Sequence, residues 1–212
     1  DRFEQSRVNV GFFDNRPLEI TLEPGRHVLP APLVLNASTI MSEIWLRSDG
    51  NASLEAAIPG APALVLADGA PPVHLHGLTL HSPVHVETGE LRVTNCSWRG
   101  AGGPGVDEGS GLLVRGGVVA VDGSSFDGCR AKRGGAVAVV GGSLEVTRTT
   151  LTGNIADDRG GGLFVAGGTA VLADGTLLEG NAAPAGAAVQ LDGGALSYAL
   201  PTPLGHWVAS AF

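Results

Sequence analysis

The chain has 212 residues, of which 33 are glycine, 43% are hydrophobic and 5% are aromatic, and its formal charge is −8. Glycine is about twice as frequent as in an ordinary protein. This disfavours a helix bundle, because glycine destabilises a helix interior by about 1 kcal/mol relative to alanine. The hydrophobic content argues against a disordered chain. The acidic balance, with Lys132 as the one lysine, disfavours nucleic acid as a partner, and the longest apolar runs are too short for a membrane span.

The first elements in chain order are short alternating strands. Apolar residues alternate with polar ones over 18–22, a Pro-Gly turn follows at 24–25, and the segment 18–34 is predicted as an opening coil. An Asp-Gly pair at 68–69 then precedes a second alternating stretch over 73–86. These patterns indicate strands bounded by tight turns.

Paired glycines recur through the second half of the chain. They occupy positions 116/117, 141/142, 167/168 and 193/194, which are 25, 26 and 26 residues apart. Each pair precedes an alternating strand, a large apolar residue, a polar or thiol side chain, a cluster of small residues and a second short strand. The large apolar position holds Phe126, Leu151 and Leu177 or Leu178, and the position three residues later holds Cys129, Asn154 and Asn181. The same frame extends back to Thr88-Gly89, with Trp98 at the large apolar position.

A unit of about 25 residues with two short strands cannot bury its apolar face alone, but a stack of such units can. The sequence therefore predicts an all-β fold, a parallel β-helix of about seven coils with a dry apolar interior. We expect a single domain over 1–200, with irregular opening coils over 1–87 and regular repeats over 88–194. A tail or linker is expected at 201–212.

The repeats resemble those of a known family. Segments 125–129 and 134–137, and likewise 151–154 and 160–163, are similar to the Phe-X-X-Asn and Gly-Gly-Ala-Ile repeats of polymorphic outer membrane proteins. Those repeats belong to the right-handed parallel β-helix, or pectin-lyase-like, superfamily, and related ones occur in surface proteins of algae and other protists. The resemblance is best over 88–194 and implies a right-handed β-helix in a cell-surface protein.

Asn154 and Asn181 fall in one column of the repeat, a column being the set of residues at the same position in successive coils. An amide at a buried turn satisfies backbone groups of its own coil and of the next coil. We therefore expect these two residues to form a structural turn ladder and to have no catalytic role.

Two other polar clusters are candidate sites. The acidic pair Asp157-Asp158 is predicted to lie on a solvated loop and to form an ion pair with Lys132 or Arg133 of the previous coil. Four histidines lie within twelve residues and are predicted to be surface side chains: His74, His76, His81 and His85. His74 and His76 could supply half of a metal site, but a third ligand is missing.

The cysteines and the possible glycosylation sites are relevant to the cellular compartment of the protein. Cys96 and Cys129 lie in adjacent coils but in different columns, so the sequence leaves a disulfide between them open. Three Asn-X-Ser/Thr triplets begin at Asn36, Asn51 and Asn95. They are glycosylation acceptors if the protein passes through a eukaryotic secretory pathway, and we expect that route.

The expected function is a non-enzymatic structural or adhesive module of a larger extracellular or cell-surface glycoprotein. Its expected partners are glycans and copies or neighbouring domains that stack on the open ends of the β-helix; no cofactor or metal is expected. Two alternatives stay open. One is a polysaccharide lyase or hydrolase, which the superfamily resemblance alone suggests, and the other is a carbohydrate-binding module with Trp45 or Trp207 as a stacking platform.

Overall fold

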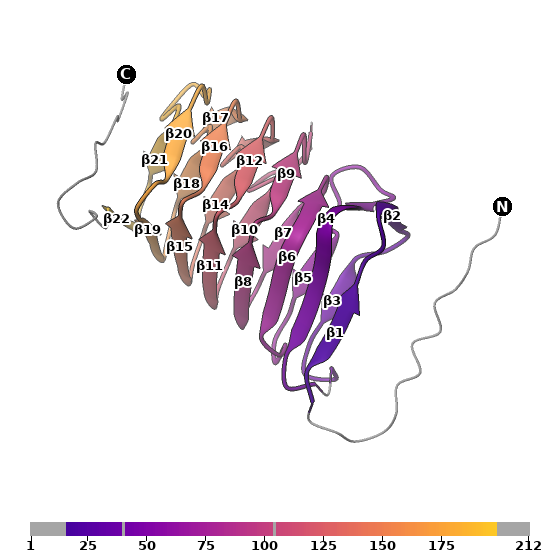
Figure 1. Cartoon of the computed structure of the whole chain (residues 1–212). Helices are drawn as coiled ribbons and strands as arrows, with labels where there is room; N and C mark the ends of the chain where they lie inside the picture. The colour runs from indigo at the N-terminus through magenta and orange to yellow at the C-terminus, as the bar shows by residue number, and fades with distance from the viewer. Residues whose placement is uncertain (1–15, 40, 104, 199–212) are drawn as a thin grey trace.

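The computed structural model describes residues 16–39, 41–103 and 105–198, and within these ranges the chain forms twenty-two β-strands and no helix. The strands stack along one axis from the N-terminal to the C-terminal end, as Figure 1 shows. All named strand pairs are parallel, for example β11 with β15 and β14 with β18. The predicted all-β fold with stacked parallel sheets is therefore confirmed. Across the described residues, no helix is long and apolar enough to cross a membrane.

Three sheets make up the stack. Sheet A contains β1 (Leu18–Thr21), β2 (Gly25–Leu29), β4 (Ile44–Ala56), β6 (Val73–Leu80), β8 (Glu90–Thr94), β9 (Ser97–Arg99), β11 (Val118–Asp122), β12 (Ser125–Asp127), β15 (Ser143–Thr147), β16 (Thr150–Thr152), β19 (Thr169–Leu172), β20 (Leu177–Glu179) and β22 (Ala195–Tyr198). Sheet B contains β3 (Leu33–Leu35), β5 (Leu64–Leu66), β7 (Val84–Val86), β10 (Leu112–Val114), β14 (Val137–Val139), β18 (Leu163–Val165) and β21 (Val189–Leu191). Sheet C contains only β13 (Arg130–Arg133) and β17 (Ile155–Arg159).

Sheet B has one strand in each coil, so its seven strands define seven coils. In the second half, the aligned positions Leu112, Val137, Leu163 and Val189 are 25, 26 and 26 residues apart. In the first half, the aligned positions Leu33, Leu64, Val84 and Leu112 are 31, 20 and 28 residues apart. The coil length is therefore regular only in the second half.

The core lies between sheets A and B and consists of inward-facing columns. Trp98, Phe126 and Leu151 align in one such column, and each is at most 1% exposed. The rings of Trp98 and Phe126 stack with centroids 4.4 Å apart. Alternation places Arg92 and Glu145 on the opposite, exposed side of their strands.

The paired glycines lie at the corner where the chain passes from sheet B to sheet A. Gly117, Gly142 and Gly168 have φ angles of +77°, +69° and +69°. A Cβ at any of these three positions would come within 2.2 to 2.6 Å of backbone atoms of the previous coil. Glycine is required here both for the left-handed conformation and for the close approach of the coils.

A second, smaller hydrophobic cluster lies on the other face of sheet B. Leu113, Ala138 and Phe164 point away from the main core and are nevertheless buried. The connections that include sheet C pack against this face: the Arg133 guanidinium lies 5.7 Å from the centre of the Phe164 ring. The prediction that Asp157-Asp158 lies on a loop was wrong, because β17 contains this pair and is paired with β13 of the previous coil.

Candidate functional site

The outer face of sheet A carries an aromatic and charged cluster near the N-terminal end. Trp45 of β4 and His74 of β6 occupy paired outward positions in neighbouring coils. Their rings stack almost in parallel, with centroids 3.9 Å apart and an interplanar angle of 4°. His74 Nε2 lies 3.3 Å from a carboxylate oxygen of Glu43, and Arg92 follows in the same column. The sequence predicted His74 as a surface side chain but did not reveal its stacking on Trp45, which depends on the register between β4 and β6.

The stacking limits what Trp45 can bind. Side chains in one outward column face each other along the axis, so the His74 ring covers one face of the indole. A sugar-stacking platform needs an open aromatic face, but on the opposite side of Trp45 the same column continues with Glu19 of β1, so both positions beside the indole are occupied. The other predicted platform, Trp207, lies outside the described residues, as do the predicted tail at 201–212 and residues 1–15.

The four clustered histidines do not converge on one point. His76 Nδ1 lies 2.9 Å from Thr94 Oγ1, and His81 Nδ1 lies 2.8 Å from the Arg99 carbonyl oxygen. His85 belongs to sheet B, where burial, and then the nearby charge of Arg115, lower its pKa. Among the residues with described positions, no group of three or more His, Cys, Asp or Glu side chains could hold a metal ion.

The acidic pair at 157–158 is divided between two cations. Asp157 accepts a hydrogen bond of 2.7 Å from Arg130 of the previous coil, and Asp158 lies 3.5 Å from Arg159 beside it. The predicted cross-coil ion pair therefore exists, but its cation is Arg130 and not Lys132 or Arg133. Both partners are nearly half exposed, so the pair contributes little to stability.

A ladder of amide side chains crosses the second half of the stack. Asn154 is fully buried; its Oδ1 accepts the backbone N–H of Cys129 at 2.9 Å and its Nδ2 donates to the Phe126 carbonyl at 3.1 Å. Asn181 repeats the arrangement one coil later, donating to the Leu151 carbonyl at 2.8 Å and accepting the Asn154 backbone N–H at 3.0 Å. Each amide thus ties its own turn to the preceding coil.

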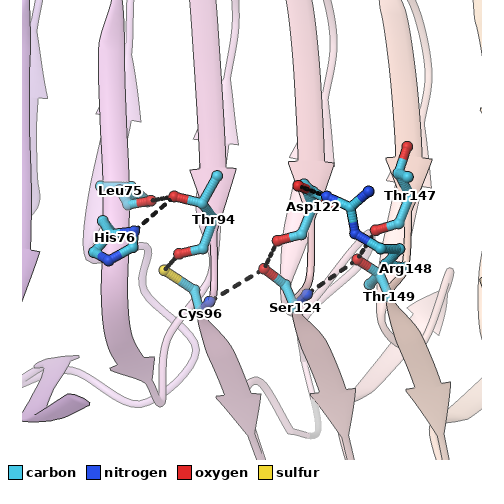
Figure 2. Close-up of polar contacts among 9 residues, drawn as sticks. All are labelled: Leu75, His76, Thr94, Cys96, Asp122, Ser124, Thr147, Arg148 and Thr149. Atoms are coloured by element: carbon cyan, nitrogen blue, oxygen red, sulfur yellow. Dashed lines mark hydrogen bonds and ion pairs between the residues drawn. The ribbon is translucent and has the colours of Figure 1, made fainter. Parts of the chain in front are cut away.

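A second polar ladder, not identified from the sequence, follows the bend inside sheet A (Figure 2). The Ser124 hydroxyl accepts the backbone N–H of Cys96 at 3.1 Å and donates to the Asp122 carbonyl at 2.9 Å. In the next coil the Thr149 hydroxyl accepts the Ser124 N–H at 3.2 Å and donates to the Thr147 carbonyl at 2.8 Å. These hydroxyls satisfy backbone groups at a buried corner where no strand pairing is available.

The two cysteines occupy positions in these two different ladders. Cys96 is in the Ser/Thr column of Figure 2, with its thiol 3.4 Å from the Thr94 carbonyl, and Cys129 precedes Asn154 in the amide column. Both are free, buried thiols in the structure. Burial raises the pKa of Cys96 to about 11 and that of Cys129 to about 12. Since the thiolate is the reactive form, these side chains are chemically protected in the folded protein.

The three glycan acceptors differ in their surroundings. Asn51 and Asn95 are exposed, whereas Asn36 is half buried and accepts the Ser38 backbone N–H on its side-chain oxygen at 2.9 Å. Asn95 has a φ angle of +52° at the bend of sheet A, where Gly123 follows in the next coil with +57°. An asparagine suits this left-handed position, so Asn95 has a conformational role whether or not it carries a glycan.

Comparison of the chain with family models, with curated proteins and with solved structures gives no match. The resemblance to polymorphic outer membrane proteins and to the pectin-lyase-like superfamily therefore remains a prediction.

Proposed function

We propose that the chain is a rigid, non-enzymatic structural module of an extracellular or cell-surface glycoprotein. In this proposal the fold is a right-handed parallel β-helix related to the pectin-lyase-like superfamily, with repeats like those of polymorphic outer membrane proteins. The module holds other parts of its parent protein at a fixed distance.

The observation that carries the proposal is how the polar side chains are used. Buried ones such as Ser124, Thr149 and Asn154 hydrogen-bond backbone groups of their own and adjacent coils. Surface arginines pair with carboxylates of a neighbouring coil: Arg47 with Glu19, Arg115 with Glu87, Arg133 with Glu108, Arg148 with Asp122 and Arg159 with Asp192. Interactions of this kind join each coil to the next, as a rigid structural module requires.

The competing function is a polysaccharide lyase or hydrolase. The purified chain is to be incubated with pectin, alginate and polygalacturonate, with an active lyase as the positive control. We expect neither unsaturated products nor new reducing ends. Formation of either product, abolished by boiling the protein, would replace the structural proposal with an enzymatic one.

The extracellular location rests on the glycan acceptors. Protein expressed in a eukaryotic secretory host is to be analysed by intact mass before and after deglycosylation, together with the variants Asn51→Gln and Asn95→Gly. Glycine retains the left-handed backbone at residue 95, so the second variant removes the acceptor without disturbing the bend. We expect each variant to lose one glycan; an unglycosylated wild-type protein would contradict the proposed route.

A further inference from the structure

The two ends of the stack present complementary strand edges. Among the described residues, β20, β21 and β22 at the C-terminal end each pair with one neighbouring strand, and so do β1, β2 and β3 at the N-terminal end. The strands β1 and β22 are the two ends of one series in sheet A, β2 and β20 are the ends of another, and β3 and β21 are the ends of sheet B. All pairs in these series are parallel, so the same strand direction occurs at both ends.

Apolar side chains that belong to the core columns are exposed or only partly buried at these two ends. Leu191 is 48% exposed, whereas Val165, one coil earlier in the same column, is fully buried. Leu178, Val189 and Leu196 are partly buried at the C-terminal end, as are Leu18, Ile20 and Leu33 at the N-terminal end. Each end therefore has apolar side chains for which a further coil would complete the packing.

Continuing the observed register by one coil predicts which residues would meet if a second copy followed. Leu196 would meet Leu18, because these residues begin and end the column that contains Ile44 and Ala170. By the same rule Val189 would meet Leu33 and Leu191 would meet Leu35. These three contacts are apolar on both sides, and each extends an existing core column. In the column of Trp98 and Phe126, Leu178 would meet His27, whose ring nitrogen already contacts the Glu23 carbonyl oxygen.

The charges on the end strands are compatible with this register. Glu179 of β20 would lie beside Val28 and diagonal to Arg26 of β2, within reach of that long side chain. Glu19 of β1 would lie opposite Ser197 of β22, whose hydroxyl can donate to the carboxylate. No two like charges are paired on these six strands.

We propose that copies of this chain associate head to tail, with β20, β21 and β22 of one copy pairing with β2, β3 and β1 of the next. The proposal rests on the structural function proposed above and names the partner of its ends as a second copy of the same chain. Because the two surfaces differ and the contact does not close on itself, the assembly grows as an open filament. Each added copy would lengthen it by about 34 Å, from seven coils at ~4.8 Å.

The test uses the full 212-residue chain in sedimentation velocity and negative-stain electron microscopy over a range of concentrations. We expect a concentration-dependent series of species and rods that lengthen in steps of one copy. Leu196→Lys at one end and Leu33→Lys at the other should each abolish the series. The matched control is Val118→Lys, since Val118 is 57% exposed on the side of the stack and should leave association unchanged. Circular dichroism and thermal unfolding establish that each variant is folded.

Mixing the two end variants gives the sharpest result. Leu196→Lys retains an intact N-terminal end and Leu33→Lys an intact C-terminal end, so an equimolar mixture should form a one-to-one dimer and nothing longer. The proposal is overturned if the wild type stays monomeric, if Val118→Lys also abolishes association, or if the mixture forms no dimer. A monomer that associates only after truncation at residue 198 would show that residues 199–212 occupy the C-terminal end, which also overturns it. The polysaccharide assays address the structural function separately, so a monomeric protein without enzymatic activity would end this proposal and leave the other standing.

Discussion

The two halves of the stack differ in how the chain passes from sheet A to sheet B. In the first half, three residues connect β2 to β3, seven connect β4 to β5 and three connect β6 to β7. In the second half, nine residues connect β12 to β14 and ten connect β16 to β18. Only the longer connections contain strands of sheet C.

This difference determines whether sheet B has one buried face or two. Where the connections are long, Leu113, Ala138 and Phe164 are at most 2% exposed on the outer face of the sheet. Where they are short, Val34 in the same column is 49% exposed. The long connections pair with one another across coils, through β13 and β17 and through the isolated bridges of Gly102 with Arg130 and of Glu108 with Arg133.

The largest expected difference between the halves concerns the core. Phe126→Ala should lower the free energy of unfolding by ~3–5 kcal/mol, because the side chain is buried and stacks on Trp98. Leu29→Ala should cost about 1 kcal/mol, since Leu29 is only partly buried in the opening coils. Urea denaturation measures both. Equal losses would mean that the opening coils are packed as tightly as the regular ones.

Alanine substitutions at two glycines with positive φ distinguish the cost of backbone strain from the cost of steric crowding. Gly50→Ala should cost ~1–2 kcal/mol for the left-handed backbone alone, because no atom lies within 4 Å of the added methyl. Gly142 also has a positive φ, +69° against +95° at Gly50, and its new Cβ would lie 2.6 Å from the Gly116 carbonyl carbon. We expect this clash in Gly142→Ala to cost a further ~1–3 kcal/mol. Thermal and urea unfolding of the two variants test this, and similar losses would contradict the role given to the glycine corner.

The amide ladder can be compared with the exposed turn of the opening coils. Asn154→Ala leaves the buried N–H of Cys129 without its acceptor, and we expect a loss of ~1–3 kcal/mol. Asn36→Ala removes the hydrogen bonds that the Ser38 backbone N–H and hydroxyl donate to the Asn36 side chain at an exposed turn and should cost about 0.5 kcal/mol. Denaturant midpoints with unchanged m-values are the measurement. An Asn154→Ala protein as stable as wild type would show that the ladder is dispensable.

The buried thiols predict a loss of stability at alkaline pH. Their folded pKa values of about 11 and 12 lie above that of an unfolded cysteine, about 8.5, so the unfolded state loses its protons first. Their contribution to stability is therefore fully present below about pH 8.5 and falls above it by ~1.4 kcal/mol per pH unit for each thiol, until the folded value is reached. Cys96→Ser, which places a hydroxyl in the Ser/Thr column, should remove one of the two contributions. An unchanged slope between pH 9 and pH 10.5 would contradict the assignment.

The smallest expected effect concerns the surface of the regular half. In a double-mutant cycle of Arg130→Ala and Asp157→Ala, the coupling should be ~0.2–1 kcal/mol and should decrease at high salt. The matched control is Lys132→Ala paired with Asp157→Ala, which should show no coupling because the cation of this pair is Arg130. A larger coupling to Lys132 would restore the partner first predicted from the sequence.

The sequence was sufficient for the parts of the fold that depend on local pattern. Alternation predicted the inward column of Trp98, Phe126 and Leu151, and the spacing of the glycine pairs predicted the coil length of the second half. Both signals arise within a single coil, from the period of a strand and from the conformation that only glycine adopts easily.

The features that the sequence did not reveal depend on the neighbouring coil. Segment 130–133 has three cationic residues and little strand propensity, and it becomes a strand because β17 offers backbone partners beside it. The Ser124 and Thr149 hydroxyls form a ladder only when their coils are stacked. The Trp45–His74 pair likewise requires the register between β4 and β6.

The constant coil length of the second half also bears on how such a chain can change over generations. Because each coil contacts mainly the coils before and after it, an in-frame duplication of residues 143–168 would insert one more coil whose corners, ladders and core columns match both neighbours. A deletion of the same segment would close the gap equally well. Recombination can therefore lengthen or shorten the molecule by one coil at a time, while the surfaces at its two ends stay the same.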